Sequence, residues 1–159
     1  QGWLLGIAAM VLIGTYNLFK RIPWLGNASH GLVMSLACLI GAAAVAPQES
    51  LPALILNARL PLVLTFLWAG LYLAANYEKD RRGDAAAGYW TAAHVLGVRG
   101  SAAVRAGFAL LICGAGMVGF SDWWTRGGLA ISVVLVLLSV KNLQKALEQH
   151  KAREVCVCT

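Results

Sequence analysis

Long apolar stretches are the feature that most limits what this chain can fold into. A helix that crosses the hydrocarbon core of a bilayer needs about 20 mostly apolar residues. Five stretches come close to this length: residues 2–19, 28–46, 51–75, 102–120 and 123–140. Only 13% of the 159 residues are charged, whereas a soluble domain carries about 25%. The sequence therefore predicts an all-α fold, a polytopic transmembrane helix bundle over residues 1–140.

The chain changes character after residue 140. The segment "KNLQKALEQHKARE" places Leu143 and Leu147 four residues apart among charged side chains. This spacing puts both leucines on one face of a helix, as in helices that lie at a membrane surface. Residues 141–159 are therefore predicted to form an amphipathic cytoplasmic tail.

The basic residues predict how the bundle is oriented. Of the 13 Lys and Arg residues, all except Arg59 and Arg126 fall on one side of a five-span arrangement. Cytoplasmic loops carry this excess, so loops 20–27 and 76–105 and the C-terminus are predicted to be cytoplasmic, with the N-terminus on the opposite side. Because the apolar stretches are predicted to span a membrane, the expected partner is the lipid bilayer. Nucleic acid is not expected, because no basic face alternates with aromatic residues that could stack on bases.

The longest polar interval, "NYEKDRRGDAAAGYWT" over residues 76–91, contains two aspartates four residues apart. On a helix that continues from the third span, Asp80 and Asp84 share one face. Mg²⁺ binds through one or two carboxylates together with phosphate oxygens and water, and Lys79 beside them offsets the charge of a phosphate. The interval indicates either a metal-held diphosphate at the membrane surface or a solvated loop whose acids pair with its bases.

Two blocks of sequence resemble the UbiA superfamily of intramembrane prenyltransferases. "NYEKDRRGDAAAGYWTAAHVLG" is similar to the family's second aspartate-rich motif, N-D-x-x-D-x-x-G-D-x-x-x-G-x-x-T, which a small apolar run and Leu-Gly follow. "YNLFKRIPWLGNASHG", residues 16–31, resembles an inter-helix segment in which Tyr and Lys-Arg precede Pro and Leu-Gly-Asn. The "WLGN" and "N-x-x-K" patterns are also similar to the chlorophyll synthase branch. Tyr77 departs from the motif, because an aspartate is common at that position.

The resemblance implies a Mg²⁺-dependent site for a prenyl diphosphate. The residues that it assigns to diphosphate and Mg²⁺ are Asp80, Asp84, Asn76, Lys79, Lys20 and Arg21. Within this set, Asp80 and Asp84 are the implied metal ligands, and the cations face the diphosphate. His30 is a separate candidate for a pigment or metal ligand, since neutral histidine can ligate a metal or a tetrapyrrole.

The family resemblance leaves two functions open. The first aspartate-rich motif of the family is absent from this sequence, so the chain resembles the C-terminal portion of a family member. The preferred interpretation is a truncated or degenerate member that acts as a non-catalytic subunit of a larger membrane complex and holds an isoprenoid or isoprenoid-tailed ligand. The alternative is part of an active Mg²⁺-dependent prenyltransferase that moves a polyprenyl group from its diphosphate to an aromatic, tetrapyrrole or lipid acceptor.

Overall fold

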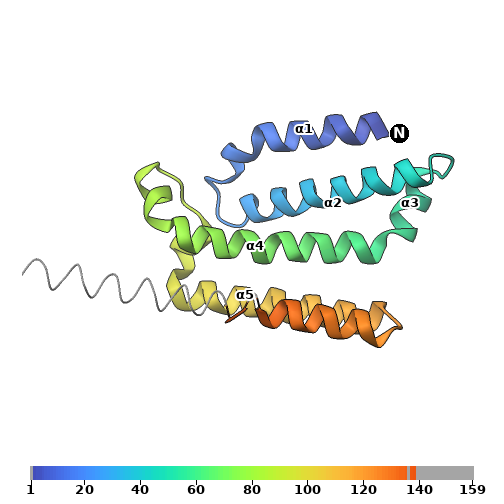
Figure 1. Cartoon of the computed structure of the whole chain (residues 1–159). Helices are drawn as coiled ribbons and strands as arrows, with labels where there is room; N and C mark the ends of the chain where they lie inside the picture. The colour runs from blue at the N-terminus through green and yellow to red at the C-terminus, as the bar shows by residue number, and fades with distance from the viewer. Residues whose placement is uncertain (1, 136, 139–159) are drawn as a thin grey trace, which may run out of the picture.

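The computed structural model describes residues 2–135 and 137–138, which form a bundle of helices (Figure 1). The helices follow the order α1 (Gly2–Phe19), α2 (Leu25–Val45), α3 (Leu51–Asn57), α4 (Arg59–Ala86) and α5 (Ala92–Gly119). Residues 123–135 are helical as well. No strand occurs within the described residues, and the predicted all-α fold is confirmed.

Four of the described helices, α1, α2, α4 and α5, are long and apolar enough to cross a membrane. The third predicted span is divided, because Ala58 separates α3 from α4. The fifth predicted span, residues 123–140, is helical over 123–135, and its last residues lie outside the described part. The amphipathic tail at 141–159 lies outside it too. The orientation across the membrane stays a prediction.

The polar connections are shorter than the sequence predicted. Helix α4 continues through both aspartates to Ala86, and α5 begins at Ala92. Within the predicted connection 76–105, residues 87–91 are the part that is not helical, and the rest belongs to α4 and α5. The predicted loop 20–27 is also too long, because α2 begins at Leu25. The reason is that Glu, Lys, Arg and Ala are strong helix formers, so a change from apolar to polar residues does not end a helix.

Helix α4 lies between α2 and α5, and α1 packs on α2 (Figure 1). Leu71 of α4 and Ile112 of α5 belong to one apolar cluster. Near the polar part of α4, Tyr77 packs with Ala93 of α5 and with Tyr16 of α1. The contact between Tyr16 and Tyr77 brings together the two sequence blocks that resemble the prenyltransferase motifs.

Two glycines shape the connection from α4 to α5. Gly88 has φ 74° in the turn after α4, and Gly97 has φ 62° and interrupts the helical geometry of α5. Glycine adopts such positive φ values without the steric cost that a Cβ brings. The segment before Gly97 approaches α4, where the His94 ring contacts the Arg81 carbonyl.

Asp122 caps the helix that covers residues 123–135. Its Oδ1 accepts a hydrogen bond of 2.7 Å from the Thr125 backbone N–H. Hydrogen bonds from the side chain and backbone of Thr125 hold the pKa of the Asp122 carboxyl below its usual range. An aspartate here satisfies an N–H group that the helix itself leaves unpaired.

Close packing of α4 on α5 depends on the absence of a side chain at Gly70. A Cβ there would lie 2.7 Å from two ring carbons of Phe108. We expect Gly70→Ala to lower the free energy of unfolding by about 1–3 kcal/mol, the usual cost of overpacking. Gly107→Ala is the matched control, because its Cβ would meet no atom within 4 Å. Unfolding in mixed detergent micelles measures both variants, and equal stabilities would contradict this packing role.

Candidate functional site

An ion pair joins the two sequence blocks. Lys20 follows the last residue of α1, and Asp84 lies near the end of α4. Lys20 Nζ donates a hydrogen bond of 2.6 Å to Asp84 Oδ1, and only 17% and 7% of the two side chains are exposed. Opposite charges interact more strongly in such a shielded place than in water. The structure thus brings together two predicted site residues that are 64 positions apart.

Three tyrosines surround this ion pair. The Lys20 ammonium lies 4.9 Å from the ring centroid of Tyr89 and 5.6 Å from that of Tyr77. The Arg21 guanidinium lies 6.0 Å from the Tyr89 centroid, and the Tyr77 and Tyr16 hydroxyls are 3.1 Å apart. These distances between cations and rings fall in the range of cation–π interactions. The charges of Lys20 and Arg21 therefore converge at the polar part of α4.

Asp80 and Asp84 lie one helical turn apart on α4, as the sequence predicted, but their environments differ. The side chain of Asp80 is 50% exposed, and its Oδ1 lies 3.8 Å from Lys79 Nζ. Asp84 is buried, and its Oδ2 has no hydrogen-bond partner. A buried carboxylate oxygen without a partner is costly. Asp84 therefore offers a free acceptor next to the accessible carboxylate of Asp80.

The carboxylates of Asp80 and Asp84 fit a Mg²⁺ ion that is bound together with a diphosphate. Mg²⁺ takes one or two protein carboxylates and completes its shell with water and phosphate oxygens. Within residues 2–135 and 137–138, no group of three or more His, Cys, Asp or Glu side chains could hold a metal ion. The Asp80 and Asp84 carboxylates therefore suit a metal ion whose other ligands come from the substrate.

The other predicted residues take different places. Asn76 is half-buried on α4, one turn before Asp80, while Lys79 is exposed. His30 lies within α2, where its ring centroid is 6.1 Å from that of Tyr16. His30 is therefore a neighbour of the tyrosine pair, and its role as a pigment or metal ligand stays a prediction.

His94 holds the α4–α5 connection in place and was not predicted as a site residue. Its Nδ1 accepts a hydrogen bond of 3.3 Å from the Thr91 N–H, and its Nε2 lies 2.8 Å from the Arg81 carbonyl oxygen. Because a carbonyl only accepts, Nε2 carries the proton. The ring also stacks on Trp90, with centroids 5.4 Å apart. The signal in the sequence is Thr-x-x-His at a helix start, a variant of the capping box.

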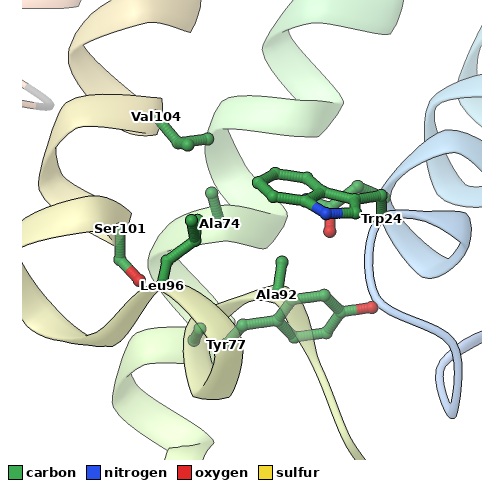
Figure 2. Close-up of a pocket in the computed structure, with 9 residues that line it drawn as sticks. Trp24, Ala74, Tyr77, Ala92, Leu96, Ser101 and Val104 are labelled. Carbon is green, nitrogen blue, oxygen red and sulfur yellow. The ribbon is translucent and has the colours of Figure 1, made fainter.

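A small cavity lies beside the site, between residues of α2, α4 and α5 (Figure 2). Its space of about 10 Å³ is near the size that one water molecule needs. Two of the residues that line it have buried oxygen atoms without hydrogen-bond partners, Asn27 Oδ1 and Ser101 Oγ. Trp24 lines it as well and has φ 72°, which is rare for a bulky residue. The cavity suits a bridging water and is too small for an aromatic ring.

Comparisons with known proteins agree with the sequence blocks. The model of the UbiA prenyltransferase family matches residues 1–155. A 4-hydroxybenzoate octaprenyltransferase from Ralstonia nicotianae is 31% identical over 121 residues, which are 76% of this chain and 38% of the relative. The matched region thus spans well under half of that relative's length. No solved structure matches the chain.

Proposed function

This chain belongs to the UbiA prenyltransferase family, and on that premise we propose that it binds the diphosphate of a prenyl donor where α1 meets α4. In this proposal it forms the half of a Mg²⁺-dependent prenyltransferase site that carries the second aspartate-rich motif. The donor's apolar chain extends along the membrane-spanning helices. The acceptor is an aromatic compound, which the name of the Ralstonia relative supports.

The Lys20–Asp84 ion pair is the observation that carries this proposal. The two blocks that resemble prenyltransferase motifs are distant in the sequence, but Lys20 Nζ of one lies 2.6 Å from Asp84 Oδ1 of the other. Arg21 and the exposed Asp80 lie beside the pair, so cations and carboxylates occur together at one polar end of the bundle. A solvated loop whose acids simply pair with its bases does not need a buried carboxylate with a free oxygen.

The chemistry follows from these charges. Transfer begins when the bond between the allylic carbon and the diphosphate oxygen breaks, and its electron pair leaves with the diphosphate. Positive groups that are already in place stabilise the charge that develops on the leaving group. Lys20 and Arg21 supply such groups, and bound Mg²⁺ adds the charge of a divalent cation. The acceptor then attacks the allylic cation and loses a proton.

A second candidate function is binding without transfer, as a non-catalytic subunit of a larger membrane complex. One observation supports it: within the described residues, the aspartates of α4 form no metal-binding group of three or more ligands. A single pair of carboxylates can retain a diphosphate with one Mg²⁺. Ionisation of the donor requires more stabilisation of the leaving group than retention does.

Binding and transfer can be measured separately on the full chain in lipid nanodiscs. We expect farnesyl diphosphate to bind in the presence of Mg²⁺ and to be released by EDTA, because the metal offsets the repulsion between carboxylates and phosphate. Radiolabelled donor together with 4-hydroxybenzoate tests transfer. Binding with transfer supports the enzyme, and binding without transfer supports the subunit. If Mg²⁺ and EDTA give the same retention, the proposed diphosphate site is wrong.

A further inference from the structure

Arg105 is a buried charge in the interior of the bundle. It lies within α5, and only 1% of its surface is exposed. None of its three guanidinium nitrogens has a hydrogen-bond partner. A charged side chain inside a membrane-spanning helix is costly, and it faces the bundle interior and pairs with another polar group. Arg105 therefore requires a partner of opposite charge.

Glu78 of α4 is the candidate for that partner, although the two side chains form no direct hydrogen bond. Its Oε2 is buried and also lacks a hydrogen bond, and its carboxylate is the charge that acts on Arg105. Charges that are shielded from water interact over longer distances than exposed ones. Ser101 and Val104, which precede Arg105 on α5, line the same cavity as Tyr77, the residue before Glu78 (Figure 2). The two helices thus face each other at this level.

Glu78 lies on the side of α4 away from the aspartates. At 3.6 residues per turn, it is rotated by roughly 160° from Asp80 and by roughly 120° from Asp84. Lys20 contacts Asp84 of α4, and the charge of Arg105 acts on Glu78, which lies about 120° around the same helix. Attraction at two such separate positions around one helix limits its rotation about its own axis.

We infer that Glu78 and Arg105 form a buried charge pair that positions α4, so that Asp80 and Asp84 face Lys20 and the diphosphate. This inference rests on the proposed function for its effect on binding. Glu78 and Arg105 are positioning residues, because they act through the aspartates and contact no substrate. Loss of one charge leaves the other uncompensated, while loss of both removes the imbalance.

The first experiment measures the position of α4 without any substrate. Spin labels are attached at Gly83→Cys on α4 and Gly107→Cys on α5, where an added Cβ meets no atom within 4 Å. The native cysteines are replaced by alanine. We expect Glu78→Gln to shift or broaden the distance distribution and Glu78→Gln/Arg105→Met to restore it. An unchanged distribution in Glu78→Gln overturns the inference.

The second experiment measures binding of farnesyl diphosphate with Mg²⁺ to the full chain in nanodiscs. We expect Glu78→Gln to raise the Kd by about tenfold or more, and the double variant to return it close to the original value. Glu78→Asp keeps the charge and should retain most of the affinity. This variant also tests the inference if Glu78→Gln folds poorly. Arg99→Gln, an exposed arginine on α5, is the control.

The two readouts separate the inference from the proposed function. If the unaltered chain binds no farnesyl diphosphate, the proposed function fails, and the spin-label distances alone decide whether the pair positions α4. If the unaltered chain binds and Glu78→Gln loses thermal stability but keeps its Kd, the pair supports the fold only, and its positioning role is overturned. A changed distance together with a raised Kd supports the inference.

Discussion

Replacing Asp80 and Asp84 together by asparagine is expected to abolish Mg²⁺-dependent retention of farnesyl diphosphate. Asparagine keeps the shape of the side chain but removes the negative charge that binds the metal. The structure adds that the two positions are not equivalent, because Asp84 is buried against Lys20 and Asp80 is half exposed. If the chain is catalytic, we expect transfer to fall by about 10²–10³-fold or more, the usual effect of losing one preorganised electrostatic contact.

Single variants and a control make this prediction sharper. Asp84→Asn should also lower the melting temperature, since it removes the anion that compensates Lys20, whereas Asp80→Asn should not. Asp122→Asn is the control, because Asp122 is exposed and lies outside α4. Filter binding of labelled farnesyl diphosphate and a thermal unfolding scan measure the two effects. Unchanged retention in the double variant would mean that the aspartates do not hold the diphosphate.

Lys20→Met is expected to remove binding and to destabilise the fold at the same time. The substitution leaves the Asp84 carboxylate buried without its cation, and breaking a buried ion pair from one side costs about 3–5 kcal/mol. The lower end of that range applies here, because 17% of the Lys20 side chain is exposed. Chemical unfolding in detergent micelles measures the loss of stability, and farnesyl diphosphate binding measures the loss of affinity.

A second substitution separates these two effects. Lys20→Met combined with Asp84→Leu removes both charges, so we expect stability to recover while binding stays lost. Lys20→Arg keeps a cation and should retain part of both properties, although arginine and lysine do not place their donors alike. Arg99→Met controls for the loss of a positive charge elsewhere. A Lys20→Met variant that is unstable but still binds the donor would show that Lys20 only supports the fold.

The sequence predicted more of the fold than of the site. Apolar stretches gave four helices that the structure confirms as long enough to cross a membrane, since burial of apolar residues in lipid depends on composition and length alone. Helix ends were less well predicted. Polar residues 76–86 continue α4, because Glu, Lys, Arg and Ala are strong helix formers. The break at Ala58 divides a stretch that was predicted as one span.

The sequence likewise predicted some residues of the site and missed others. The residues that resemble family motifs were identified from sequence order. Lys20 and Asp84 are in contact, and their role in holding a diphosphate stays a prediction. Tyr89, His94 and Arg105 were not assigned to a site. Tyrosine, histidine and arginine occur in many environments, so their type and spacing carried no signal until their neighbours were known.

The sequence by itself determined that this chain is a membrane-spanning helix bundle with an aspartate-bearing polar segment, and it identified the family. Those properties depend on local composition and on motifs, which are read residue by residue. The tertiary structure alone decided that Asp84 is buried against Lys20, that Asp80 stays accessible, and that Arg105 is buried without a hydrogen-bond partner. The physical reason is that a charge's partner and exposure depend on how the helices pack, which residues distant in the sequence determine together.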